Sequence, residues 1–368
     1  MQATIPGLGN EQNGPINWLK KNRYLIGLLI FLIIFPFLVA LVTGDSVANV
    51  LASEPGWAKS WEDQLIRVFI LAIYAISYDL IFGITGLLSF GHAMFFAAGA
   101  YFTGIAFKSL EWGLPETLAG IVVIGILQAL LFGIVLPRVK GITFALVTLG
   151  IASMFFIIIQ SSELAEWTGA DVGLQGVIVP DYINSTTERY RFYLIALFAA
   201  FFVYLIYRRF VDSPTGRVCV ASRENESRAL MLGYNTFYFK LIALIVSSIT
   251  AAFAGLLHTI HAPIVSPEIA GLEWTVAALL MILIGGVGTL SGAYVGALIF
   301  GLLKHYLDRW VGGAAANFLL GTFYILLVLF IPFGIVGTLR MHSLEVRRGR
   351  DYLIGLVTGR GQASAEDK

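Results

Sequence analysis

The amino-acid sequence predicts an all-α, polytopic membrane helix bundle with about ten spans. The chain has 368 residues, of which 58% are hydrophobic and only 13% are charged. A soluble domain of this length needs far more charged surface. Apolar runs of about 20 residues, the length that crosses a hydrocarbon core, follow one another along the chain. Short polar or glycine-rich segments separate these runs.

The predicted spans occupy a transmembrane domain, residues 24–338, between a cytoplasmic N-terminal segment, residues 1–23, and a cytoplasmic tail, residues 339–368. No signal peptide is expected before the first span. Glycines interrupt the run that holds the eighth and ninth spans, so the limits of these two stay open. In order, the expected spans are 24–43, 64–82, 87–107, 116–136, 142–161, 191–207, 241–260, 274–289, 292–307 and 316–338.

The distribution of Lys and Arg predicts that both termini lie in the cytoplasm. With ten spans and the N-terminus inside, 17 of the 24 basic residues fall in cytoplasmic segments. Cytoplasmic loops carry an excess of Lys and Arg. The basic residues that fall outside are Lys59, Arg67, Lys108, Arg189, Arg191, Lys304 and Arg309.

A charged segment, residues 208–240, lies between two spans on the predicted cytoplasmic side. Ser222 can cap a helix start, Glu224 and Arg228 have the favourable i,i+4 order, and Gly233 can end the helix. A short capped helix between two spans has little reason to exist unless a cytosolic partner binds it. The segment therefore predicts an interaction surface.

Two glycine-rich stretches, residues 83–91 and 285–292, resemble each other and fall at predicted cytoplasmic reversals. An internal duplication would suit a transporter, and chance similarity between glycine-rich hairpins explains the pattern equally well. No Gly-Lys pair occurs in the chain, so a Walker A lysine is absent and no ATP hydrolysis by this chain is expected. The glycines favour close helix approach, with small-residue pairs at Gly292 and Gly296 and at Gly99 and Thr103.

Four polar residues near the first glycine-rich stretch are candidates for a translocation path: Asp79, Thr85, Ser89 and His92. Ionisable residues within membranes are usually functional, although each of these also suits a packing or interfacial role. The histidines and the single cysteine, Cys219, lack metal-ligand spacing, and no catalytic constellation is recognisable, so an enzyme is not expected. The spans are nearly free of charge, which suggests that energy enters from outside this chain.

Four segments in order resemble branched-chain amino acid ABC transporter permeases of the LivM type. They are YDLIFGITGLLSFGHAMFFAAGAY from Tyr78, RVKGITFALVTLG from Arg138, GRVCVASRENESRALMLGYN from Gly216 and SPEIAGLEWTVAALLMILIGGVGTLSGAYVG from Ser266. The sequence departs from the family where Asp79 replaces a common Asn, Ser222 replaces Ile and Ala293 replaces Pro.

This resemblance implies a type II-like ABC importer permease in the bacterial plasma membrane, forming half of a translocation pathway. It implies four kinds of partner: a second homologous permease, two P-loop ATPases that hold ATP and Mg²⁺, an extracytoplasmic binding protein and membrane lipid. Neither nucleic acid nor a cofactor of this chain's own is implied. The coupling helix would be residues 222–232, followed by Gly233, with an ATPase contacting Arg223, Glu224, Glu226 and Arg228.

Three alternatives stay open at the level of sequence. The stretch ESRALMLGYNTFYFK, from Glu226, also resembles urea and short-chain amide permeases, so the same machine with a different substrate remains possible. A secondary carrier would use Asp79 and His92 for protons. A membrane enzyme would need clustered acids or metal ligands, which the sequence does not show.

Overall fold

A computed structural model describes residues 23–44 and 56–339 of the chain. Most of the predicted N-terminal segment, part of the connection between the first two predicted spans and nearly all of the predicted tail lie outside these residues. Within them the structure is helical, and its one β-bridge pairs Leu174 with Val265. The chain divides into two compact units, one ending at Glu62 and the other beginning at Asp63.

The first unit contains α2 (Arg23–Thr43) and the first turns of α4 (Trp57–Asp79). The sequence of α2 is apolar on all sides, which is typical of a helix surrounded by lipid rather than one packed against a soluble core. Pro36 lies inside this helix; proline is more frequent in transmembrane helices than in soluble ones.

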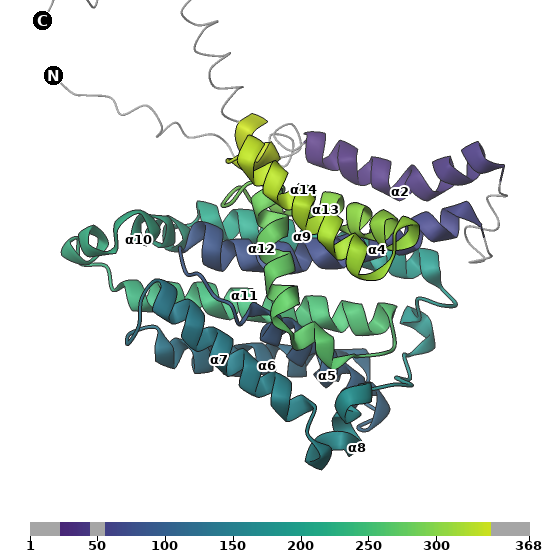
Figure 1. The fold of residues 1–368 in the computed structure, drawn as a ribbon, viewed down its shortest axis with the longest axis horizontal. Helices are drawn as coiled ribbons and strands as arrows, with labels where there is room; N and C mark the ends of the chain where they lie inside the picture. The colour runs from purple at the N-terminus through teal and green to yellow at the C-terminus, as the bar shows by residue number, and fades with distance from the viewer. Residues whose placement is uncertain (1–22, 45–55, 340–368) are drawn as a thin grey trace, which may run out of the picture. The chain divides into compact units, whose positions relative to one another are not determined.

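The second unit contains the rest of α4 and most of the described chain (Figure 1). A π-helical turn, η1 (Leu80–Ile84), continues α4. The longer helices that follow are α5 (His92–Lys108), α6 (Leu114–Val135), α7 (Ile142–Ile159), α9 (Arg189–Asp212), α10 (Pro214–Met231), α11 (Thr236–His261), α12 (Leu272–Gly285), α13 (Ser291–Trp310) and α14 (Gly313–Phe330). Short helical turns lie between α7 and α9 and before α12.

The described residues contain seven helical segments that are long and apolar enough to cross a membrane. Each of the ten predicted spans corresponds to a helix, but α5, α12 and α13 fall outside these seven. With 17 and 14 residues, α5 and α12 are about 26 and 21 Å long, short of a core of about 30 Å. Residues 86–91 are not helical, so the predicted start of the third span at residue 87 is wrong, and α5 begins at His92.

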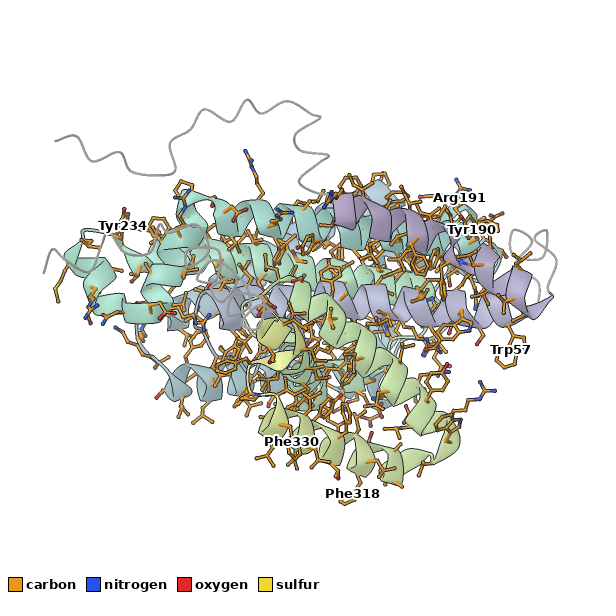
Figure 2. The ribbon with its side chains drawn as sticks, turned by 90° about the horizontal axis from the view of Figure 1, so that it is seen from above. Trp57, Tyr190, Arg191, Tyr234, Phe318 and Phe330 are labelled. Carbon is orange, nitrogen blue, oxygen red and sulfur yellow. The ribbon has the colours of Figure 1, made fainter. Side chains whose placement is uncertain are left out.

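Large apolar side chains cover much of the outer surface of the second unit, which suits contact with lipid. Figure 2 shows Phe318 and Phe330 pointing outward from α14, and their exposed fractions are 74% and 75%. In water such a surface would favour aggregation or partner binding. In a bilayer it matches the hydrocarbon around it.

The core of the second unit is the contact of α11 with α5 and α6, which lie along one side of α11 (Figure 1). Small residues permit this approach. A Cβ on Gly99 would collide with the Ala252 backbone, and a Cβ on Gly255 would collide with the backbone of Phe96 and Ala100. The sequence predicted close packing at Gly99, and the structure confirms it.

The α12–α13 hairpin is packed in the same way. A Cβ on Gly296 would overlap the Met281 carbonyl, and Gly285 and Gly292 are in mutual backbone contact. The predicted small-residue pair at Gly292 and Gly296 therefore lies at the contact between these two helices. Close backbone approach of this kind supplies the van der Waals packing that holds helices together in lipid.

We expect Gly255→Val to lower the stability of the purified protein by at least 1–3 kcal/mol, roughly the cost of overpacking. The added side chain would meet backbone atoms, which cannot move aside. Gly150→Val on α7 is the control, because Gly150 is exposed and has no atom within 4 Å of its ideal Cβ position. Thermal unfolding in mild detergent measures the difference. Equal melting temperatures of the two variants would contradict the packing described.

Candidate functional site at the junction of two helix reversals

The Asp79 carboxylate joins the end of α4 to the reversal between α12 and α13. Its Oδ1 accepts a hydrogen bond from the backbone N–H of Gly288 at 2.7 Å, and its Oδ2 accepts one from Leu290 N–H at 3.2 Å. The carboxylate is fully buried. A buried polar group of this kind is stable only when it is hydrogen-bonded, so the two amide donors keep it in place.

The two glycine-rich stretches of the sequence meet at this carboxylate. A Cβ on Gly83 would overlap both the Asp79 carboxylate and the Gly288 amide. Gly288 has φ +74°, and a Cβ there would lie 2.9 Å from the Gly83 carbonyl oxygen. Only glycine suits both positions. The resemblance between the stretches thus accompanies a direct contact between them.

Arg223 of α10 binds the same junction. Its Nη1 donates a hydrogen bond to the Gly83 carbonyl oxygen in η1. A Cβ on Gly86 would lie 2.9 Å from the Arg223 Cγ, so the arginine stem also packs against the first reversal. We name the group Asp79, Gly83, Arg223, Gly288 and Leu290 the junction. It connects α4, α10, α12 and α13.

Helix α10 differs from the helix that the sequence predicts. It begins at Pro214, and the Ser213 hydroxyl caps it by accepting from Gly216 N–H at 3.2 Å. Ser222 is buried inside the helix, so its predicted role as the N-cap is wrong. The reason is the sequence Ser213-Pro214, which supplies both a cap and a proline for the first turn.

Asn225 interrupts α10 at the centre of the charged segment. Its backbone is extended, with φ −161° and ψ 98°, and its Oδ1 accepts from Arg228 N–H at 3.0 Å, which caps a second short helical segment. This break separates Glu224 from Arg228. Within residues 23–44 and 56–339 they form no ion pair with each other or with another side chain, so the predicted i,i+4 pair is wrong.

Glu226 faces the protein. Its carboxylate lies 2.5 Å from Lys240 Nζ and 3.3 Å from Lys140 Nζ, and it accepts from the Thr236 hydroxyl at 3.0 Å. Burial alone would raise the pKa of Glu226, but the contacts with Lys240, Thr236 and Lys140 outweigh it and hold this pKa below its ordinary value of 4.5. Glu226 therefore fastens α10 to the start of α11 and to the α6–α7 connection.

The turn that follows α10 presents an apolar tip. Gly233 has φ +87° and its N–H bonds to Leu230, which ends the helix. The tip consists of four exposed side chains, and Figure 2 shows Tyr234 at this end of the unit. Their exposed fractions run from 46% to 82%, and the residues are Leu230, Met231, Leu232 and Tyr234. Exposed Glu224 and Arg228 lie on the same helix.

Thr85, Ser89 and His92 are buried and lie close to Asp79 in sequence. The Thr85 hydroxyl bonds to Leu80 O in η1, and Ser89 Oγ accepts from Gly91 N–H. His92 Nε2 lies 2.8 Å from Ser77 Oγ, and the imidazole is surrounded by aromatic rings of Tyr74, Tyr78 and Phe95. These contacts place all three in packing positions around the first reversal.

The described residues hold no group of three or more His, Cys, Asp or Glu side chains suited to a metal ion. Cys219 is fully buried in α10, and burial raises the pKa of its thiol to about 11. The bonds from Asp79 to Gly288 and Leu290 were not predicted from the sequence. The signal available for them was the resemblance of the two glycine-rich stretches.

Comparison with known proteins gives consistent results. Residues 60–331 match the family described as branched-chain amino acid transport system / permease component. The chain is 28% identical to a probable branched-chain amino acid transport permease protein LivM of Methanocaldococcus jannaschii, over 60% of this chain and 66% of the relative. It is 24% identical to the high-affinity system permease protein LivM of Salmonella typhimurium, over 90% and 78%. The LivH permease of that organism is 26% identical, over 72% and 91%. No solved structure matches the chain.

We expect Asp79→Ala to destabilise the protein strongly, because the buried Leu290 amide and the part-buried Gly288 amide both lose their acceptor. Each unsatisfied amide costs about 1–3 kcal/mol. Asp79→Asn keeps one acceptor oxygen in its side-chain amide and should therefore lose less stability than Asp79→Ala. Asp212→Ala, at an exposed aspartate, is the control. Melting temperatures in detergent order the variants, and an unchanged melting temperature for Asp79→Ala would contradict the role of the junction.

We expect the contribution of Glu226 to stability to depend on pH. Because the folded-state pKa is lowered, this contribution is present above pH 4.5 and is lost as the pH falls below that value. Glu226→Gln should therefore melt below wild type at pH 7, and the difference should shrink below pH 4.5. Glu224→Gln, at an exposed position on the same helix, should change little at any pH. A pH-independent difference for Glu226→Gln would contradict the ion-pair assignment.

Proposed function

Because the chain belongs to the branched-chain amino acid transport permease family, as a LivM-type member, we propose that it is the permease subunit of an ATP-driven importer of branched-chain or other hydrophobic amino acids. It is a multi-pass integral protein of the plasma membrane. In the proposed machine it forms half of the translocation pathway and has no catalytic activity of its own.

The proposed partners follow from this role. A second homologous permease supplies the other half of the pathway, and the similarity to relatives named both LivM and LivH supports a pair of permeases. Two P-loop ATPases bind ATP and Mg²⁺, and an extracytoplasmic binding protein delivers the substrate. Binding of ATP closes the ATPase pair and moves the segment of this chain that the ATPase holds.

The junction is the observation that carries the proposed coupling. An ATPase subunit would bind the apolar tip together with Glu224 and Arg228. Movement of α10 would pass through Arg223 to the Gly83 carbonyl in η1, and through Asp79 to the α12–α13 reversal. Closely packed helices change position as units, so the displacement would reach α12 and α13. Glu226 keeps α10 and α11 together during this motion.

We also propose that all ten helices that correspond to predicted spans lie in the membrane, with both termini in the cytoplasm. The shorter α5 and α12 would be buried among longer helices, where full span length is not needed. In this topology α10 and its tip face the ATPases. Import of urea or short-chain amides by the same machine remains the alternative substrate. A proton carrier is less well supported, because Asp79 is fully buried with its carboxylate bound to two backbone amides, and His92 is fully buried with Nε2 beside the Ser77 hydroxyl.

We expect Met231→Asp to weaken binding of the ATPase without unfolding the chain. Met231 is 82% exposed, so the substitution removes no internal packing, whereas an apolar contact with a partner would lose an anchor. Two quantities are measured. The first is the amount of ATPase that co-purifies with tagged permease in mild detergent, and the second is the increase in ATP hydrolysis in liposomes when substrate and binding protein are added. Both should fall at least tenfold.

Arg209→Glu is the matched control, because Arg209 is exposed at the end of α9 and lies outside the tip. It should leave co-purification and ATP hydrolysis near wild-type values. If the Met231→Asp variant bound the ATPase and stimulated ATP hydrolysis as well as wild type, the tip would not be the ATPase-binding surface. Substrate uptake by the chain alone, abolished by an uncoupler, would overturn the importer as a whole.

A further inference from the structure

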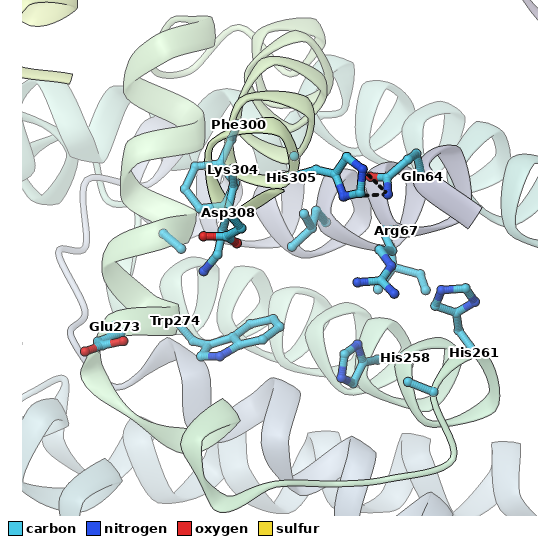
Figure 3. Close-up of a pocket in the computed structure, with 15 residues that line it drawn as sticks. Gln64, Arg67, His258, His261, Glu273, Trp274, Phe300, Lys304, His305 and Asp308 are labelled. Carbon is cyan, nitrogen blue, oxygen red and sulfur yellow. Dashed lines mark hydrogen bonds between the residues drawn. The ribbon is translucent and has the colours of Figure 1, made fainter. Parts of the chain in front are cut away.

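The second unit contains a cavity of about 300 Å³ between α4, α11, α12 and α13 (Figure 3). This volume is at the lower end of the range for small-molecule sites, about 300–1,000 Å³. On each helix, the residues that line the cavity are separated along the chain from the junction. The middle of α4, the first turns of α12 and the second half of α13 line the cavity, whereas the junction lies at the end of α4 and in the reversal between α12 and α13.

Charged side chains of both signs line this cavity. Arg67 and Lys304 are cationic, and Glu273 and Asp308 are anionic. Lys304, Glu273 and Asp308 form no ion pair in the described parts of the chain, although Lys304 and Asp308 are four residues apart on α13. Arg67 binds Asp63 through Nε, at 3.2 Å, and Figure 3 shows its guanidinium pointing into the cavity.

The remaining walls combine apolar and uncharged polar side chains, several of which are held in place by contacts. The Trp274 ring lies along the cavity (Figure 3) and stacks on Phe96 with centroids 5.0 Å apart. The Trp274 carbonyl accepts from the Tyr74 hydroxyl at 3.2 Å. At another wall the Gln64 side-chain amide lies 2.8 Å from His305 Nδ1. Side chains fixed in this way form a preorganised surface.

We infer that this cavity binds a small zwitterionic amino acid on its way through the importer. A guanidinium or ammonium group suits the ligand carboxylate, and Arg67 and Lys304 supply them. The Glu273 and Asp308 carboxylates and the face of Trp274 suit its ammonium group. Apolar residues such as Ile70 and Phe300 suit an aliphatic side chain.

This inference rests on the proposed import function and selects between its two substrate classes. Urea and short-chain amides carry no charge, so a site for them has no use for the exposed Lys304, Glu273 and Asp308 side chains, which form no ion pair in the described residues. An amino acid carries both charges, and both must be compensated when it leaves water. The four charged side chains therefore favour an amino acid over urea.

The same helices would link occupancy to coupling. Glu273 and Trp274 begin α12, and Lys304 and Asp308 lie near the end of α13. The reversal that joins these two helices is the part that Asp79 holds. A shift of the reversal would change the separation of the charged groups around the ligand, and release of the ligand would follow from the same movement.

The test uses the full-length chain with whichever partners it retains on purification, reconstituted in phosphatidylcholine nanodiscs without the binding protein. Binding of radiolabelled L-leucine is measured, with 4-methylpentanoate, isoamylamine, urea and O-phosphoethanolamine as competitors. We expect leucine to bind and the single-charge analogues to compete at least tenfold more weakly. Urea should not compete. Stronger competition by phosphoethanolamine than by unlabelled leucine would assign the cavity to a lipid headgroup and overturn the inference.

Two variants locate the site. Lys304→Gln and Glu273→Gln should each weaken leucine binding at least tenfold. Arg309→Gln and Glu268→Gln, at neighbouring exposed positions that do not line the cavity, should not. Absence of leucine binding, equal competition by urea, or equal loss in the control variants would overturn the inference. Leucine binding together with uncoupler-sensitive uptake by the chain alone would support the cavity while contradicting the importer, so the two failures are distinguishable.

Discussion

The buried Asp79 carboxylate, with two backbone amides bound to it, is the contact on which the rest of this arrangement depends. A carboxylate in such a place is stable only with donors at short distance, and Gly288 and Leu290 supply them. These donors are available because two glycines permit backbone contact between reversals that are far apart in sequence. Arg223 then adds the charged segment to the same point. Asp79 thereby joins α4 to the α12–α13 reversal, and Arg223 joins α10 to the neighbouring turn.

Much of the fold was predictable from sequence, because the apolar runs and the glycine spacing act locally or between neighbouring elements. All ten predicted spans correspond to helices, and the close approaches at Gly99 and Gly296 are confirmed. The break at Asn225 was not predictable, because an asparagine inside a charged helix-forming segment gives no strong stop signal and a single residue changes the direction of the chain there.

The candidate site was predictable only in part, because its geometry joins residues separated by about two hundred positions. Asp79 was singled out by its type, but its partners are backbone amides, which leave no mark in side-chain patterns. Glu226 was expected to contact an ATPase, and its contacts with Lys240 and Lys140 could not be predicted, because they join three separate elements. The cavity went unrecognised because Arg67, Glu273 and Lys304 come from three helices. Their shared location on the predicted outer side was the only available signal.

The burial of Cys219 has a practical consequence for studies of motion. The chain has one cysteine, and its thiol is enclosed in α10 with its pKa raised to about 11. At neutral pH it is almost entirely protonated, and thiol reagents react with the thiolate. Cys219 is therefore expected to react little with the thiol reagents used to attach site-directed probes. A cysteine pair introduced at the tip and at the mouth of the cavity can carry fluorophores or spin labels, so that distances between the two ends are followed through a transport cycle without first removing a native residue.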